Sequence, residues 1–426
     1  MNSFYIGRRF YTFTLWLLLP YVAFHLLWRA RKQPEYLSHI GERFGHYTVA
    51  SKRPIIWLHT VSVGETRAAA NLIQQLQKTY PQHQLLLTHT TPTGRAASEQ
   101  LYGNEVLRVY LPYDYPFVVE NFLQHFKPSL GILLETEIWF NLIHACHIKN
   151  IPLLLLNARL SEKSAARYAR FSHLTQLGLK ELSAVAAQSE NDAIRLKNLG
   201  ATQVAVMGNL KFDIVPPSTM LELGAVLRVQ WGQSRKIFLA ASTRIGEEAL
   251  LLQALQQINI SNMLTVIVPR HPQRFNEVAD LLTQRNIRFQ RRSKNLPITD
   301  DIQVLLGDSM GEMFAYYAAC DMAFIGGSLL PYGGQNLIEA CSVGKPVLIG
   351  PHTFNFAQAT EQAVECGAAV RVRDVAELAQ IVQNLFNHPE KIDAASKAAL
   401  KFVNAHRGAT QLAMTHIAPL LLYSQK

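Results

Sequence analysis

The sequence predicts an α/β protein with two doubly wound halves, each a parallel sheet covered by helices on both faces. Near-continuous apolar runs of strand length alternate with amphipathic segments over most of the 426 residues, as in parallel sheets that are buried on both faces. A chain of this length is too long for one core. The alternation stops at Val215-Pro216-Pro217-Ser218 and then resumes. Because proline fits neither helix interiors nor central strands, this stretch marks the joint between the halves.

The N-terminal segment, residues 1–32, is predicted to be a membrane anchor. Residues 10–28 read FYTFTLWLLLPYVAFHLLW and carry no lysine, arginine, aspartate or glutamate, which just reaches the length of about 20 residues that a membrane span needs. Arg29, Arg31 and Lys32 follow directly. This end does not look like a signal-peptide cleavage site, so we expect an uncleaved anchor with its basic flank in the cytoplasm. A helix lying in the membrane interface and a buried core helix are the alternatives.

The two halves are expected to span residues 33–215 and 218–426. Apolar runs predict strands in the first half at residues 55–61, 84–88, 107–111, 130–134, 152–157, 184–188 and 203–207, with helical patterns at 65–78, 116–126, 138–148 and 191–199. Strands in the second half are predicted at 236–240, 264–268, 302–306, 322–325, 346–349 and 368–372. Two terminal helical patterns, 375–386 and 391–422, could cross back toward the first half. Two halves that face each other leave a central cleft at the carboxyl ends of their strands, where α/β proteins bind ligands.

Two carboxylates follow apolar strands in the first half. Glu65 ends the stretch HTVSVGE, residues 59–65, and Glu135 opens ETEIW, residues 135–139. The helix dipole alone stabilises an acid in the first turn of a helix. Joints of this kind also carry catalytic groups, and transfer to a hydroxyl needs a carboxylate that accepts a proton. We expect this half to bind the acceptor, and we expect the helix N-terminus to favour the ionised form of Glu65.

The strongest cluster of motifs lies between residues 323 and 351 in the second half. Gly326-Gly327-Ser328 ends a strand, and Gly333-Gly334-Gln335-Asn336 opens a helix that contains Glu339. Glycines let backbone N–H groups approach an anion closely, and a helix N-terminus adds unpaired donors. The pattern therefore predicts a phosphate cradle, with Glu339 as an acceptor for a ribose diol. Tight turns with glycine at positive φ are the alternative interpretation.

Other joints of the second half add cations and a further loop. IVPRHPQRF, residues 267–275, places Arg270 and His271 after a strand, and LGDSMGEM, residues 306–313, places Met310 and Gly311 after another. Arginine contacts phosphate through two parallel hydrogen bonds. Any one of these joints could be an ordinary helix cap, but several along one rim of a sheet favour a binding site.

The charge balance suits an anionic partner, and no motif predicts a metal. The 41 basic and 31 acidic residues give a net charge of +10, which favours nucleic acid, anionic lipid or a phosphorylated substrate. Because no D-x-D pair stands at a strand end, we expect arginine and helix N-termini to replace Mg²⁺. The four cysteines show no C-x-x-C spacing and are expected to be buried free thiols.

Taken together, these motifs resemble one family. In order between residues 41 and 356, the chain contains GERFG, HTVSVGET, THTTPTGR, LPYDYP, ETEIWFNLI, NARLS, LKFD, VPRHPQRF, GDSMGE, FIGGSLLPYGGQNLIEA and GPHTFNF. This set is similar to that of the 3-deoxy-D-manno-octulosonic acid (Kdo) transferases of lipopolysaccharide synthesis. The resemblance implies a GT-B fold, in which two Rossmann-like domains face a central cleft, and it is compatible with the N-terminal anchor.

The resemblance also implies the reaction and its residues. It implies an inverting, metal-independent transfer of Kdo from CMP-Kdo, without a cofactor, to the tetraacylated precursor of lipid A (lipid IVA). Glu65 matches the general base, and Glu135 matches a second active-site carboxylate. The family's donor-binding residues fall on Arg270, His271, Met310, Gly311, Gly326, Gly327, Ser328, Asn336 and Glu339. Anionic lipid at the cytoplasmic face of the cell inner membrane is an expected partner, and nucleic acid is not.

Two other interpretations stay open at this point. Another GT-B nucleotide-sugar enzyme, such as an epimerase, would share the fold, but the anchor and the context of HTVSVGE argue against it. A membrane-tethered protein that binds nucleotide or lipid without turnover would not need the carboxylates at the strand ends.

Overall fold

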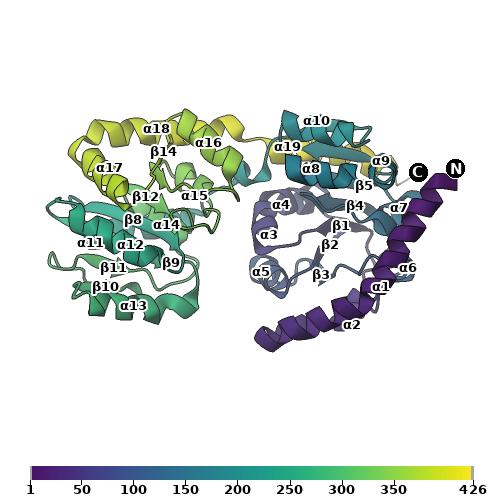
Figure 1. Ribbon diagram of the computed structural model, residues 1–426, viewed down its shortest axis with the longest axis horizontal. Coiled ribbons are helices and arrows are strands. Elements are labelled where there is room, and N and C mark those ends of the chain that lie inside the picture. The colour runs from purple at the N-terminus through teal and green to yellow at the C-terminus, as the bar shows by residue number, and fades with distance from the viewer. Residues whose placement is uncertain (1, 424–426) are drawn as a thin grey trace. The chain divides into compact units, whose positions relative to one another are not determined.

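The structure is a computed structural model that describes residues 2–423, and it divides into two compact units (Figure 1). The first unit contains the chain up to Asp213 together with the segment from Arg407 onward, and the second contains Ile214–His406. Each unit has its own parallel sheet and its own hydrophobic core. Both are therefore doubly wound α/β units, as the apolar pattern predicts.

The first unit is built on a seven-stranded parallel sheet with the order β3-β2-β1-β4-β5-β6-β7. Its strands are β1 (Ile55–His59), β2 (Gln84–His89), β3 (Leu107–Tyr110), β4 (Pro128–Leu134), β5 (Leu153–Ala158), β6 (Ala184–Ala187) and β7 (Val204–Val206). The order reverses between β1 and β4, which are parallel neighbours. A reversal of this kind is the topological switch point, where open α/β sheets bind their ligands.

Helices cover both faces of this sheet. They are α3 (Val63–Ala68), α4 (Ala70–Thr79), α5 (Pro92–Tyr102), α6 (Pro116–Phe126), α7 (Phe140–Ile148), α8 (Glu162–Ala169), α9 (Ser172–Lys180) and α10 (Glu190–Asn198), followed by the 3-10 turn η2 (Leu210–Asp213). Successive residues of β1 alternate between two cores, with Ile55 and Trp57 in one and Ile56 and Leu58 in the other. The helix predicted at 65–78 is instead two helices, and the first begins earlier because Ser62 caps it.

Helix α1 (Asn2–Lys32) runs alongside the first unit (Figure 1) and is followed by η1 (Pro34–Tyr36) and α2 (Ile40–Arg43). The hydroxyl of Tyr11 donates a hydrogen bond to Asp114 at 2.8 Å, and that of Tyr115 donates one to the carbonyl of Leu15 at 2.7 Å. On the opposite side, α1 exposes large apolar side chains, which include Phe10, Phe13, Leu17, Tyr21 and Phe24. The segment Gly7–Arg31 is long and apolar enough to cross a membrane.

The second unit also has a seven-stranded parallel sheet, in the order β10-β11-β9-β8-β12-β13-β14. Its strands are β8 (Lys236–Thr243), β9 (Met263–Pro269), β10 (Phe289–Arg291), β11 (Val304–Leu306), β12 (Met322–Ile325), β13 (Val347–Ile349) and β14 (Ala369–Arg371). Here the order reverses between β8 and β12. Strand β10 is not predicted from the sequence, because this three-residue edge strand is half-buried and two of its residues are polar.

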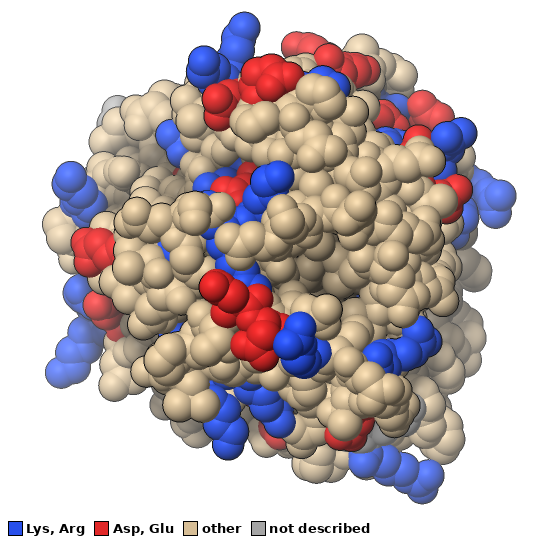
Figure 2. All heavy atoms as spheres, turned by 90° about the vertical axis from the view of Figure 1, so that its left-hand side faces the viewer, with Lys and Arg blue, Asp and Glu red and all other residues tan. Residues whose placement is uncertain are grey.

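The helices of the second unit surround a core that includes Phe238, Phe324, Leu251 and Val382. They are α11 (Ser218–Trp231), α12 (Glu247–Gln257), α13 (Phe275–Gln284), α14 (Met313–Ala319), α15 (Leu337–Ser342), α16 (Ala357–Glu365), α17 (Val375–Asn387) and α18 (Pro389–His406), with the 3-10 turns η3 (Pro272–Arg274) and η4 (Arg292–Lys294). On the face that Figure 2 shows, Lys and Arg are interspersed with Asp and Glu. The excess positive charge therefore forms no single basic patch on that face.

The C-terminal segment predicted as one helix at 391–422 is two helices, α18 and α19 (Ala409–Tyr423). They are separated at Gly408, whose φ of +109° suits a residue without Cβ. Helix α19 belongs to the first unit, where Ala413 and Ile417 join the same core as Ile56. Asp213 holds the start of α19 by accepting hydrogen bonds from the backbone N–H groups of Gly408 and Thr410.

Candidate active site

In the first unit, the predicted carboxylates lie at the switch point of the sheet. Glu65 is in the first turn of α3, directly after β1, and Glu135 directly follows β4. Because β1 and β4 are parallel neighbours, the residues that follow them meet at one edge of the sheet. Glu137 lies in the same loop as Glu135, and both act electrostatically on Glu65. The structure therefore brings Glu65 and Glu135 together, with Glu137 of the same ETEIW motif as a third acid.

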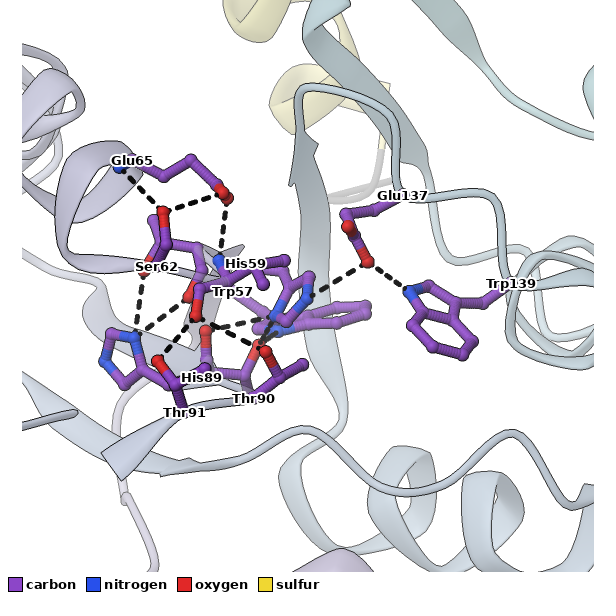
Figure 3. Close-up of polar contacts among 12 residues, drawn as sticks. Trp57, His59, Ser62, Glu65, His89, Thr90, Thr91, Glu137 and Trp139 are labelled. Atoms are coloured by element: carbon purple, nitrogen blue, oxygen red, sulfur yellow. Dashed lines mark hydrogen bonds and ion pairs between the residues drawn. The ribbon is translucent and has the colours of Figure 1, made fainter. Parts of the chain in front are cut away.

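Glu65 takes part in reciprocal hydrogen bonds at the start of α3 (Figure 3). The Oγ of Ser62 accepts from the backbone N–H of Glu65 at 3.4 Å and donates to Glu65 Oε1 at 3.0 Å. Glu65 Oε2 accepts from the backbone N–H of Val61 at 2.7 Å. Ser followed three residues later by Glu is the sequence signature of a capping box, although here the carboxylate accepts the N–H of Val61, one residue before the N-cap. The capping role is thus confirmed, and it leaves lone pairs of the carboxylate free to accept a proton.

The pKa of Glu65 is raised to about 7. Burial is the largest cause, and the negative charges of Glu135 and Glu137 raise the pKa further, while the hydrogen bonds from Val61 and Ser62 lower it. The hydrogen bonds at the start of the helix favour the ionised form of Glu65, as expected, but desolvation and two like charges outweigh them, so the net shift of the pKa is upward. A carboxylate that titrates near neutral pH is well suited to take a proton from a hydroxyl.

Glu135 combines an unusual backbone conformation with a cationic partner. Its φ is +60°, in the left-handed region that residues other than glycine rarely adopt. Its Oε1 lies 3.2 Å from Nζ of Lys211, which is in η2. Asn157 fixes η2, because its Oδ1 accepts the backbone N–H of Leu210 at 3.1 Å. Lys211 belongs to the LKFD motif, but its separation of 76 residues from Glu135 hides the pairing in the sequence.

A buried histidine contacts the third carboxylate (Figure 3). His59 ends β1 and is fully buried, with Nδ1 2.9 Å from the hydroxyl and 3.0 Å from the carbonyl of Thr88. Its Nε2 lies 3.7 Å from Glu137 Oε2. The indole N–H of Trp139 donates to the same oxygen at 2.7 Å. These contacts fix Glu137 beside the end of β1, so the three carboxylates share one environment.

In the second unit, cationic side chains gather where β8 and β9 end. Arg270 Nε donates to Gln335 Oε1 at 3.3 Å, and Nη1 of Arg244 lies 3.0 Å from Nε2 of His271. Burial lowers the pKa of His271, and the charges of Arg244, Arg270 and Arg274 lower it further. An anion bound here would offset this repulsion. Donor binding by Arg270 and His271 stays a prediction, and Arg244, which follows the first strand of this unit, lies beside His271.

The glycine-rich joint after β12 is organised around a buried carboxylate that the sequence analysis does not identify. Glu247, in the first turn of α12, is fully buried. It accepts hydrogen bonds from four backbone N–H groups: Gly327 at 2.6 Å, Arg244 at 2.9 Å, and Ser328 and Leu329 at 3.0 Å. The predicted phosphate cradle is therefore wrong for the N–H groups of Gly327 and Ser328, because an internal anion already pairs them. Donor contacts through other atoms of these residues stay a prediction.

The remaining predicted residues lie on joints of the same sheet. Gly326 allows a close backbone approach, since a Cβ there would lie 2.5 Å from the carbonyl oxygen of Ser242. Asn336 caps α15 by accepting the N–H of Ile338 at 3.1 Å, and its Nδ2 donates to Glu339 at 3.1 Å. Met310 is exposed in the loop after β11, and Gly311 has a φ of +83°. Their contacts with a donor stay predictions.

The four cysteines are free thiols, and three of them are buried. Cys146, Cys320 and Cys341 are buried free thiols, as predicted, whereas Cys366 is exposed at the end of α16. Among residues 2–423, no group of three or more His, Cys, Asp or Glu side chains is placed to hold a metal ion. Metal independence itself stays a prediction.

Comparisons with known proteins identify the class of the protein. Residues 38–214 match the family described as 3-deoxy-D-manno-octulosonic-acid transferase (kdotransferase), and residues 244–402 match glycosyl transferases group 1. The fold is similar to that of a glycosyltransferase from Rickettsia africae, with a TM-score of 0.57 and 17% identity over 87% of this chain and 99% of that one. It is also similar to Anabaena HepE in complex with UDP, with a TM-score of 0.56 and 16% identity over 86% and 99%. The protein is a glycosyltransferase with the GT-B fold.

Two relatives that align over almost the whole chain define the family. The 3-deoxy-D-manno-octulosonic acid transferase of Haemophilus influenzae is 38% identical over 97% of this chain and 99% of its own length. The protein of the same name from Bordetella pertussis is 38% identical over 95% of this chain and 97% of its own length. The chain belongs to the 3-deoxy-D-manno-octulosonic acid transferase family, as its motifs predict.

Proposed function

We propose that the protein transfers Kdo from CMP-Kdo to a hydroxyl of lipid IVA, the tetraacylated precursor of lipid A. The observation that carries the proposal is Glu65, a carboxylate with a pKa of about 7 at the switch point of the first unit. Membership of the family supports the donor and acceptor classes. We assign the acceptor to the first unit, where carboxylates gather, and the nucleotide to the second, where arginines gather.

Glu65 is the proposed general base of an inverting displacement. The acceptor hydroxyl attacks the anomeric carbon of Kdo, its proton passes to Glu65, and the bond between that carbon and the phosphate oxygen of CMP breaks. Attack opposite the leaving CMP inverts the anomeric configuration. Because burial, together with the charges of Glu135 and Glu137, raises the pKa of Glu65, its carboxylate is a stronger base than an ordinary one. Arrival of the proton also removes the repulsion of Glu65 by Glu135 and Glu137.

The leaving CMP carries away the electron pair and the negative charge. We propose that Arg270 and His271, joined by Arg244, stabilise this charge in place of a metal ion. Guanidinium groups stay charged and contact phosphate oxygens through parallel hydrogen bonds. The pKa of His271, which burial and three arginines lower in the free protein, should rise when a phosphate binds beside it.

We propose that α1 anchors the protein at the cytoplasmic face of the inner membrane. The helix would lie along the membrane surface, in the interface between lipid and water. Tyr11 and Tyr115 tie one side of α1 to the first unit through their hydrogen bonds to Asp114 and to the carbonyl of Leu15. A perpendicular span would break these bonds. The other side exposes apolar residues, and Arg8, Arg9, Arg29 and Arg31 flank them at both ends. An apolar side bounded by cations is typical of helices that lie in an anionic interface.

Reconstituted transfer tests the proposal. Full-length protein in phospholipid vesicles is mixed with CMP-Kdo and lipid IVA, and free CMP and the mass of the lipid product are measured. We expect CMP release that depends on the acceptor, together with a mass increase of whole Kdo units. Release of CMP without lipid product, or transfer from UDP-sugars but not from CMP-Kdo, would contradict the proposal.

A further inference from the structure

Helix α8 of the first unit presents a basic side without ionic partners. Lys163, Arg167 and Arg170 are exposed and lie at positions i, i+4 and i+7, so their side chains lie on one side of the helix. Arg170 is the C-cap of the helix. Among the side chains that the structure describes, none of the three forms an ion pair, whereas Arg195 nearby is paired with Glu162. Like charges four residues apart weaken an isolated helix. The cluster therefore weakens α8 slightly, and solubility alone does not require three cations on one side of a helix.

The other side of α8 connects the candidate active site with α1. Tyr168 packs against the core of the first unit. Burial raises the pKa of Tyr168, and the charge of Glu137 raises it further, which places the phenol near the carboxylates. The same phenol interacts electrostatically with Tyr11 of α1. In addition, Thr136, which follows Glu135, donates a hydrogen bond to the carbonyl of Arg159, just before α8. Tyr168 of α8 thus lies near Tyr11 of the anchor and near Glu137 of the carboxylate cluster.

The turn after α8 carries an exposed aromatic ring near the anchor. Phe171 is 65% exposed between α8 and α9. Helix α9 contacts α1, where Leu174 lies against Gly7. An apolar helix, an exposed aromatic ring, a basic side and the carboxylate cluster therefore belong to neighbouring elements of the first unit. These surfaces match the parts of an anionic glycolipid, which are acyl chains, phosphate and a reactive hydroxyl.

We propose that Lys163, Arg167 and Arg170, the α8 cluster, bind the phosphorylated sugar head group of the acceptor glycolipid. This inference rests on the proposed function and adds the surface that receives the acceptor. A phosphate monoester carries close to two negative charges and three strong acceptor oxygens, which match a cluster of guanidinium and ammonium groups. The acyl chains stay in the membrane beside α1 and Phe171, and the sugar hydroxyl reaches toward Glu65.

The test compares two triple variants that remove the same charge from the full-length protein. One is K163Q/R167Q/R170Q. The matched control is K78Q/K180Q/K197Q, which removes three exposed lysines of the first unit that also form no ion pair among the described residues. Each is assayed with lipid IVA in vesicles and with its deacylated, water-soluble bisphosphate. We expect the KM for both acceptors to rise roughly tenfold to hundredfold in the α8 variant only, with an unchanged KM for CMP-Kdo.

The two acceptors separate head-group binding from attraction to a charged membrane. A KM for the soluble bisphosphate that equals that of wild type would overturn the proposal, even if vesicle binding were lost. An equal rise in the control variant would overturn it as well, since total charge would then be the cause. K163R/R167K/R170K should keep the wild-type KM, and matching melting temperatures exclude a folding defect. Failure of wild type to transfer Kdo would instead contradict the proposed function.

Discussion

The two units place an acid at the same point of the same fold and use it in opposite ways. Glu65 and Glu247 each lie in the first turn of the helix that follows the first strand of their sheet, beside the switch point. Glu65 accepts one backbone and one side-chain hydrogen bond and keeps access to solvent. Glu247 accepts four backbone N–H groups and is fully buried. The carboxylate of Glu65 is accessible to a substrate, whereas that of Glu247 is buried and already hydrogen-bonded.

The comparison shows that the surroundings of an acid, more than its position, separate a catalytic from a structural role. Burial raises the pKa of both groups. Two further carboxylates raise that of Glu65, which leaves it near neutrality with room for a proton. The carboxylate of Glu247 accepts hydrogen bonds from four backbone N–H groups, so a proton on it would break hydrogen bonds. We therefore expect substitutions at Glu65 to change turnover and those at Glu247 to change folding.

Loss of the base should give the largest effect. Glu65→Gln keeps the shape and the caps from Val61 and Ser62 but cannot accept the proton, so kcat should fall by a factor of about 10² to 10⁴. Initial rates with saturating CMP-Kdo and acceptor measure this effect, and the KM for CMP-Kdo should stay constant. Wild-type turnover by Glu65→Gln would move the base to Glu135 or Glu137.

Substitution of Glu247 should mainly destabilise the second unit. Glu247→Gln replaces one carboxylate oxygen by an NH₂ group that faces N–H donors, which should cost about 2–4 kcal/mol in the free energy of unfolding. Urea denaturation measures the cost. Glu222→Gln, an exposed substitution on α11, serves as the control and should change stability little. Equal stability of the two variants would show that the four hydrogen bonds do not organise the joint.

The same pair of acids shows how far the sequence could predict the protein. Apolar runs predict both sheets, and strand ends locate Glu65, Glu135 and Arg270, because these signals are local. In the sequence, Glu247 looks like any acid in a first helical turn, and only the fold brings Gly327 to it from 80 residues away. Lys211 meets Glu135 for the same reason. The sign of the pKa shift of Glu65 depends on burial and on Glu135, neither of which a motif contains.

Loss of a cation of the second unit should appear chiefly in donor binding. Arg270→Ala removes a guanidinium beside Gln335 and His271, so the KM for CMP-Kdo should rise roughly tenfold or more, the loss of one charged hydrogen-bonding group. The KM for the acceptor should not change. Steady-state kinetics with each substrate varied in turn measure both values. A rise in the acceptor KM with a constant donor KM would reverse the assignment of substrates to the two units.

The smallest and most diagnostic effect concerns the pH dependence set by the neighbours of Glu65. As the base, Glu65 must be ionised, so kcat/KM should fall as pH drops through about 7, the pKa that burial and like charges produce. Glu135→Gln removes the like charge that has the larger effect on the pKa of Glu65. The pKa of Glu65 then falls, and the acidic limb of the profile should move to lower pH, by about one pH unit or less. The plateau should also drop, because a less basic carboxylate accepts a proton less readily. The control Glu222→Gln should leave the pH profile of kcat/KM unchanged. If the acidic limb of the Glu135→Gln profile stayed near pH 7, a group other than Glu65 would be titrating.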